Sequence, residues 1–261
     1  MQNNGMEKFK KIISGYAAKA AYPVIFLGEV FSAVPQLKKR KRELFYYLEL
    51  CGVKSLPVVI TISLLMGAII AMQGALQMRK VGAEIFIVDL VGFAVLKEFG
   101  PLMVAIIATG RAGSAFAAEI GTMKVNEEIY ALESMGVNPY GYLVHPKLAA
   151  MLIAMPLLTV FGDIFSILGG MFLSINALDL TLVAYWTRTV AILNGTTFLL
   201  GVFKSTVFGT LITLAGCCCG FSSSGDAQGV GRSATTAVVS SIFLIVIADA
   251  VMTLLFSFIG Y

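Results

Sequence analysis

The chain has 261 residues, of which 58% are hydrophobic and only 13% are charged. Soluble globular domains carry about 25% charged residues, so this composition excludes an ordinary water-soluble enzyme or binding domain. The formal net charge is +4, and residues 1–54 hold ten of the 19 basic side chains. A basic end beside apolar blocks suits an anionic lipid surface better than nucleic acid, so no nucleic-acid partner is expected.

The N-terminal segment, residues 1–55, is expected to lie at the membrane interface in amphipathic helices. Its apolar stretch, residues 12–34, is interrupted by charged side chains such as Glu29. Such a stretch is more typical of an interfacial helix than of a spanning one. A sixth span here is the alternative, but it would place the N-terminus on the outer side, which disagrees with the distribution of basic residues. Residues 56–261 form the expected transmembrane domain.

Five later segments are apolar and close to the length of about 20 residues that crosses a bilayer. They are residues 56–78, 88–118, 148–175, 196–220 and 234–259. The expected fold is therefore an all-α integral membrane protein with five transmembrane helices. Five helices leave little room for a conduit, which favours a homodimer that encloses a central cavity.

The basic residues predict how these spans are oriented, because cytoplasmic segments carry an excess of lysine and arginine. Residues 1–55, 111–147 and 221–235 contain 14 basic side chains, whereas residues 79–90 and 176–196 contain three. The N-terminus is therefore expected in the cytoplasm and the C-terminus on the outer side.

The polar segment 123–136, between the second and third spans, has the pattern of a short amphipathic helix. Val125, Ile129 and Leu132 fall on one face, and Gly136 suits the position just after a helix end. Its acidic residues lie elsewhere: Glu127, Glu128 and Glu133. The residues alone leave two interpretations open, a solvated loop helix or an element that docks on a cytoplasmic partner.

Ionisable residues inside spans are costly, at least about 2.5 kcal/mol at the bilayer centre, so they usually face a partner or a wet cavity. Lys204 and Asp249 lie in consecutive antiparallel spans, at depths that place them within reach of each other. They either hold the bundle together as an ion pair or line a route for an anionic headgroup. Asp163 in the third span is more ambiguous, because a polar interior contact would explain it fully.

A second charged pair, Lys97 and Glu98, precedes Gly100-Pro101, where a kink or an unwound turn is expected. In the first span, Gln73 interrupts an apolar surface that includes Ile70 and Leu76. Such a surface fits an acyl-chain pocket with a polar entrance, and it fits a plain helix–helix contact as well.

Several catalytic patterns are absent from the sequence. It contains no G-x-x-x-x-G-K-[ST] phosphate loop, no H-E-x-x-H and no G-x-S-x-G. One histidine and four cysteines, three of them adjacent, indicate no metal site. An intramembrane enzyme is therefore not expected, and any active transport must take its energy from another chain or from an ion gradient.

Three runs of residues resemble the MlaE (YrbE) permease family. They are LKEFGP at 96–101, TGRAGSAFAAEIGTM at 109–123 and EEIYALESMGVNP at 127–139. A weaker likeness continues through Pro146-Lys147 and through GRSATTAVV at 231–239, so that the resemblance covers roughly residues 45–260.

The resemblance implies the permease subunit of an ABC transporter that moves phospholipids between inner and outer membranes and maintains outer-membrane lipid asymmetry. It implies two copies of the chain with lipid at their interface, and a Gram-negative inner membrane as location. This chain would bind no cofactor, because ATP and Mg belong to a separate ATP-binding subunit. Further implied partners are a periplasmic hexamer of MCE-domain proteins and a STAS-domain protein. A structural anchor for the MCE ring is the alternative.

The resemblance also implies roles for individual residues. Lipid would contact Ile70, Gln73, Leu76, Val81, Lys97 and Glu98. Lys204 and Asp249 would be intramembrane charges coupled to transport. The segment 123–136 would be the coupling helix, which meets the ATPase through Glu127, Glu128, Ile129, Leu132, Glu133 and Met135. Val81 departs from the family, where an aromatic residue also occurs, and Lys97 stands where arginine is also found.

Overall fold

The computed structural model describes residues 40–82, 86–178, 180–193, 195–223 and 225–258. Helices and short connections account for all of this part of the chain, which contains no strand. Five of its helical stretches are long and apolar enough to cross a membrane, as the sequence predicts. The expected interfacial stretch 12–34 lies outside the described residues.

The first half of the chain forms α2 (Lys41–Cys51), η2 (Val53–Ser55), α3 (Leu56–Met78), η3 (Arg79–Val81), α4 (Ile87–Ala94), η5 (Val95–Phe99), α5 (Gly100–Ala108), η6 (Thr109–Gly113) and α6 (Ser114–Val125). The second half forms α7 (Glu128–Ser134), α8 (Pro139–Leu178), α9 (Leu182–Ile192), α10 (Gly195–Phe221) and α11 (Ala227–Phe258).

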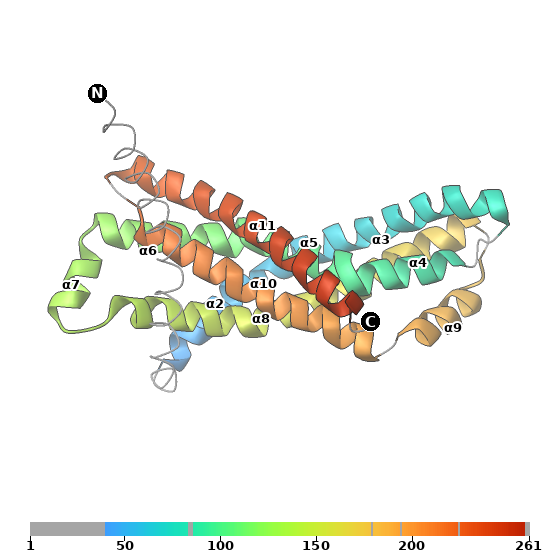
Figure 1. The fold of residues 1–261 in the computed structure, drawn as a ribbon, viewed down its shortest axis with the longest axis horizontal. Helices are drawn as coiled ribbons and strands as arrows, with labels where there is room; N and C mark the ends of the chain where they lie inside the picture. The colour runs from blue at the N-terminus through green and yellow to red at the C-terminus, as the bar shows by residue number, and fades with distance from the viewer. Residues whose placement is uncertain (1–39, 83–85, 179, 194, 224, 259–261) are drawn as a thin grey trace, which may run out of the picture.

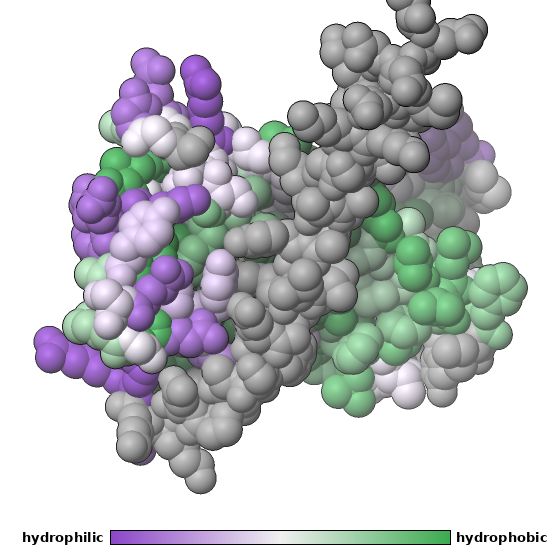
Figure 2. All heavy atoms as spheres, turned by 60° about the vertical axis from the view of Figure 1, so that its left-hand side comes forward, coloured by the Kyte–Doolittle hydropathy of each residue, from purple (hydrophilic) through white to green (hydrophobic). Residues whose placement is uncertain are grey.

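The spans run along the length of an elongated bundle (Figure 1). α3, α8 and α11 run away from the end that carries α7, whereas α10 and the continuous stretch from α4 to α6 return toward it. α9 lies at the opposite end, between α8 and α10 in the chain. Figure 2 shows hydrophilic side chains gathered at the α7 end and hydrophobic ones over the part behind it. This distribution fits a bundle whose α7 end projects into water.

The third span is longer than the sequence predicts. α8 begins at Pro139, before the expected start at residue 148, and it contains Pro146 and Pro156. Its first turn is capped by the side chain of Asn138, whose Oδ1 accepts hydrogen bonds from the backbone N–H groups of Tyr140 at 2.9 Å and Gly141 at 3.4 Å. Proline suits the first helical position, where no N–H is needed, so Asn138-Pro139 starts a helix here.

Small residues allow the spans to pack closely. A Cβ atom at Gly67 would collide with the backbone carbonyl of Ser166, and one at Gly169 would collide with that of Leu64, so α3 and α8 touch through their backbones. Gly216 and Gly220 pack in the same way on Gly113 and on Ala117 of α6. This GxxxG pair therefore contacts the second span of its own chain. Close packing of this kind drives helix association in lipid.

Replacing Gly169 with alanine is therefore expected to lower the stability of the bundle by about 1–3 kcal/mol, because the added methyl group overpacks α3 against α8. Gly231 is the matched control, since a Cβ there would meet nothing within 4 Å, and alanine in an open helical position is favourable by up to about 1 kcal/mol. Thermal unfolding of both variants in detergent measures the difference. Equal melting temperatures would contradict the close backbone contact.

α9 is a helix that the sequence interpretation treated only as part of an outer segment. The hydroxyl of Thr181 caps it by accepting a hydrogen bond from the backbone N–H of Ala184 at 3.3 Å. Arg188 then binds Asp89 of α4 through two hydrogen bonds, of 2.7 and 2.8 Å, and lies over the ring of Phe86. The hydrogen bonds to Asp89 raise the pKa of Arg188 above its ordinary value. This contact holds α9 against the start of the second span.

Candidate functional site

Three spans meet at the ammonium group of Lys204. This side chain comes from α10 and is only 3% exposed. Its Nζ lies 2.8 Å from Oε2 of Glu98 in η5 and 2.8 Å from Oδ1 of Asp249 in α11. The structure thus brings Lys204 and Asp249 together and adds Glu98 to them. We call these three residues the intramembrane charge cluster.

The backbone around Glu98 explains why Lys204 is placed there. Pro101 has no N–H, so in a regular α-helix the carbonyl of Lys97, four residues earlier, would lack a donor. Nζ of Lys204 supplies that donor at 3.2 Å. The sequence predicted a kink or an unwound turn at this point, whereas the structure widens the helix into the π-helical turn η5 and continues it. Single π-helical turns are frequent at functional sites.

Thr253 completes the hydrogen bonding of the cluster. Its hydroxyl accepts from Nζ of Lys204 at 2.8 Å and donates to Oε1 of Glu98 at 2.8 Å. Sequence reasoning missed this residue. The available signal was its spacing, because Thr253 lies one helical turn after Asp249 and therefore on the same face of α11.

A cavity of about 220 Å³ borders the cluster. Its lining joins charged and hydroxyl groups to apolar ones: Lys97, Glu98, Leu200, Lys204, Thr253, Phe256 and Ser257. Lys97 forms no ion pair within the described residues, and its Nζ lies 5.8 Å from the centre of the Phe93 ring. The adjacent Lys97 and Glu98 are therefore not paired with each other. A half-buried lysine beside an apolar wall is suited to an anionic group that carries an apolar chain.

The residues predicted on α3 lie apart from this cavity. Ile70 is half-buried and packs against a small apolar cluster that includes Ala71 and Ile87. Gln73 is exposed, and Leu76 is 57% exposed on the surface of the single chain. Val81 belongs to η3, but its side chain is outside the described part of the structure. The lipid-binding role of these four positions stays a prediction.

The segment 123–136 contains the expected short helix, with different bounds. α6 continues to Val125, Glu127 adopts a left-handed conformation with φ 62°, and α7 follows. Gly136 has φ 73°, and the bonds from Gly136 to Glu133 and from Val137 to Leu132 close the helix as a Schellman motif. The prediction of Gly136 as the terminating residue is confirmed.

The side chains in and beside α7 follow the amphipathic pattern, with apolar residues on the buried face and acidic residues on the exposed face. Ile129 is buried and Leu132 is partly buried, and both pack against the core of the bundle. The remaining predicted contact residues are exposed: Glu127, Glu128, Glu133 and Met135. α7 and the residues beside it therefore present an acidic surface at the end of the molecule, with two large exposed hydrophobic side chains, Tyr130 and Met135.

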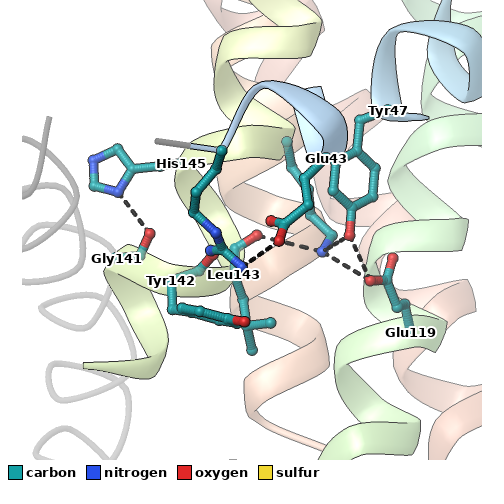
Figure 3. A network of polar contacts seen from close by, with 9 residues as sticks. Glu43, Tyr47, Glu119, Gly141, Tyr142, Leu143 and His145 are labelled. Carbon is teal, nitrogen blue, oxygen red and sulfur yellow. Dashed lines mark hydrogen bonds and ion pairs between the residues drawn. The ribbon is translucent and has the colours of Figure 1, made fainter. Parts of the chain in front are cut away.

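A second polar network includes Tyr47 and Glu119 (Figure 3). Lys147 of α8 is 0% exposed, and its Nζ donates to the hydroxyl of Tyr47 at 2.8 Å and to Oε1 of Glu119 at 3.1 Å. The Tyr47 hydroxyl donates to the same Oε1 at 2.6 Å. The network joins α2, α6 and α8, the helices around the attachment of α7. The sequence offered no signal for it, because Lys147 stands beside Pro146 in what reads as a cytoplasmic segment.

The comparisons with known proteins agree with this architecture. The family model described as "Permease MlaE" matches residues 44–255. A probable ABC transporter permease protein of Rickettsia prowazekii is 39% identical over 205 residues, which cover 78% of this chain and 79% of the relative.

More distant relatives belong to photosynthetic organisms. A probable ABC transporter permease protein of Synechocystis is 31% identical over 85% of this chain and 84% of its own length. The chloroplastic protein TRIGALACTOSYLDIACYLGLYCEROL 1 of Arabidopsis thaliana is 32% identical over 89% of this chain and 66% of its own length. With a family match over most of its length and relatives of this similarity, the chain belongs to the MlaE family of ABC transporter permeases.

Proposed function

We propose that this chain moves phospholipids between the inner and outer membranes of a Gram-negative bacterium, and so maintains the lipid asymmetry of the outer membrane. Its N-terminus lies in the cytoplasm and its C-terminus in the periplasm. The observation that carries the proposal is the intramembrane charge cluster, because buried charges beside a partly apolar cavity suit an amphipathic cargo. As an ABC transporter permease, the chain works with an ATP-binding partner.

The exposed side chains of α3 support a homodimer. Gln73 and Gln77 are exposed on a helix of membrane-spanning length, where hydrocarbon offers an amide no hydrogen-bond partner. A second copy that faces this surface would enclose a central cavity, and lipid headgroups there would supply the missing partners. Ile70, Gln73, Leu76 and Val81 would then line the lipid route that leads to Lys97 and Glu98.

The name of the Arabidopsis relative refers to a glycolipid built on diacylglycerol, which supports lipid as the cargo of this family. An MCE-domain hexamer on the periplasmic side would receive or deliver the lipid, and a STAS-domain protein would bind the ATPase. In the chain itself, the two carboxylates hold Lys204 in place, and Lys97 is the cation available for a lipid phosphate.

The test is reconstitution of the chain with its ATP-binding partner and the MCE protein in proteoliposomes. We expect ATP-dependent transfer of fluorescent phospholipid, and native mass spectrometry of the purified dimer is expected to show bound phospholipid. Transfer without nucleotide would point to an ion-gradient carrier and overturn the proposal. A complex that binds the MCE hexamer but never carries lipid at the dimer interface would instead identify a structural anchor.

α7 is proposed as the coupling helix. Replacing both Glu128 and Glu133 with lysine is expected to reduce stimulation of the partner's ATPase by about tenfold or more, because both carboxylates are exposed and their reversal repels a basic docking groove. The folded bundle should keep its melting temperature, since neither side chain is buried. The control is Lys80→Glu, an exposed charge reversal in η3. Unchanged ATPase stimulation in the double variant would remove α7 from the interface.

A further inference from the structure

A second cavity lies away from the charge cluster. At the junction of α2 and α3, against α8, a groove of about 430 Å³ opens on the surface of the chain. Its lining is almost entirely apolar and includes Phe45, Val53, Leu157 and Phe161, which are all exposed. It shares no lining residue with the cavity beside Lys204.

The local sequence explains why the groove exists. α2 ends at Cys51, and the chain turns through Gly52 and η2 before α3 begins. Gly52 has no side chain and faces Ala154 of α8, where a Cβ would lie 3.7 Å from that methyl group. Gly52 and Ala154 are both small and leave space in the groove, and Phe45 and Val53, before and after Gly52 in the chain, also line it.

One rim of the groove carries the carboxylate of Glu49, and Lys54, its ion-pair partner, lies beside the groove but outside its lining. Glu49 lies one helical turn after Phe45, so both project from the same face of α2 into the groove. Oε1 of Glu49 accepts from Nζ of Lys54 at 3.1 Å, and the two side chains are 59% and 48% exposed. Such an exposed pair contributes little stability. Glu49 therefore retains a free carboxylate oxygen, and Lys54 retains N–H groups for another partner.

The level of the groove along the bundle places its charges at a membrane surface. Leu56 begins the 23-residue apolar helix α3, so Glu49 and Lys54 precede the hydrocarbon region while Leu157 and Phe161 face into it. Lysine beside the end of a span extends to the headgroup layer. An occupant must therefore offer a hydrocarbon chain below, and both a positive and a negative group above.

We propose that this groove binds a phospholipid whose headgroup contains a primary ammonium, as in phosphatidylethanolamine. The phosphate would bind Lys54, the ammonium would donate to Glu49, and one acyl chain would lie along Leu157 and Phe161. A phosphatidylglycerol headgroup lacks the ammonium and leaves Glu49 facing a negative lipid. A phosphatidylcholine headgroup carries positive charge but has no N–H to donate. The site is independent of transport, and with the N-terminus in the cytoplasm, as proposed above, it would lie in the inner leaflet.

The test uses the fact that the chain has one tryptophan, Trp186 in α9. In the full-length chain with Trp186→Phe, a reporter is placed in the groove by Phe161→Trp. The matched control is Ile164→Trp on the same helix, which is exposed but does not line the groove. Each protein is placed in nanodiscs whose phosphatidylethanolamine, phosphatidylglycerol or phosphatidylcholine carries brominated acyl chains, and quenching of the tryptophan is measured.

We expect phosphatidylethanolamine to associate with the groove reporter about fivefold more strongly than the other two lipids, which corresponds to about 1 kcal/mol. The control reporter should be quenched equally by all three. Glu49→Gln should remove the preference over phosphatidylcholine, and Lys54→Gln should weaken all three lipids at the groove, with unchanged melting temperatures. Equal quenching at both reporters would overturn the proposal. So would a groove reporter that no lipid quenches, because residues before 40 or a second copy would then cover it.

Discussion

Lys204→Met is expected to abolish lipid transfer and to lower the free energy of unfolding by about 3–5 kcal/mol, the usual effect of removing one partner from a buried ion pair. The loss leaves the carboxylates of Glu98 and Asp249 facing each other in the membrane with no cation between them. It also leaves the carbonyl of Lys97 without the donor that replaces the missing N–H of Pro101. Thermal unfolding in detergent and transfer in proteoliposomes measure the two effects.

A neutral version of the cluster separates its structural role from its transport role. The triple variant Lys204→Met, Glu98→Gln and Asp249→Asn removes all three charges with little change in shape. Replacing a buried ion cluster as a whole is often nearly neutral for stability. The triple variant should therefore regain most of the free energy of unfolding that Lys204→Met loses. Transfer should stay absent if the charges act on the lipid. Recovery of transfer together with stability would show that the cluster only holds the three spans together.

The second large effect is expected at Lys147. Replacing it with methionine should cost up to about 3 kcal/mol, because Glu119, whose side chain is 36% exposed, and the hydroxyl of Tyr47 lose the buried donor that they share. Tyr47→Phe removes two hydrogen bonds, one to Lys147 and one to Glu119, but leaves the ion pair in place, and should cost about 1–2 kcal/mol. Because the network joins the helices on both sides of α7, partial loosening should also reduce ATPase stimulation. The free energy of unfolding and the ATPase rate of the reconstituted complex test both expectations.

Lys41→Met is the control for Lys147→Met. It makes the same chemical change outside the network, because Lys41 is exposed on α2. It should change the free energy of unfolding by no more than about 0.5 kcal/mol, as ordinary surface substitutions do. If both variants behaved alike, burial of Lys147 would not be the source of its effect. The additional change Glu119→Gln in the Lys147→Met background should recover part of the loss, because it removes the unpaired charge.

For Asp163, the sequence position predicts burial of the side chain but not its hydrogen-bond partners. A polar interior contact was one expectation for it, yet its Oδ1 atom is buried without a hydrogen-bond partner among the described residues and lies against Gly100. Any larger residue at position 100 would meet this carboxyl group. The glycine before Pro101 is therefore required by a neighbour on α8 as well as by the local backbone.

The sequence by itself determined the five spans of the described residues, the bounds of the first one, the termination of α7 before Gly136 and the family. Each of these depends on local properties: the length of an apolar block against the thickness of a bilayer, the conformation that glycine permits, and a contiguous motif. The first span was predicted at residues 56–78, and α3 occupies Leu56–Met78.

The sequence predicts that Lys204 and Asp249 lie within reach of each other, but only the tertiary structure decided the other polar contacts between helices. Glu98 and Lys204 are 106 residues apart, Tyr47 and Lys147 are 100 apart, and Asp89 and Arg188 are 99 apart. The contacts depend on the rotation and register of each helix. A membrane span that is apolar on all sides does not encode that rotation in its hydropathy, because lipid and protein neighbours are both apolar. The π-helical turn at η5 and the backbone contacts at Gly67 and Gly169 set the rotation instead, and both become visible only when the helices are packed together.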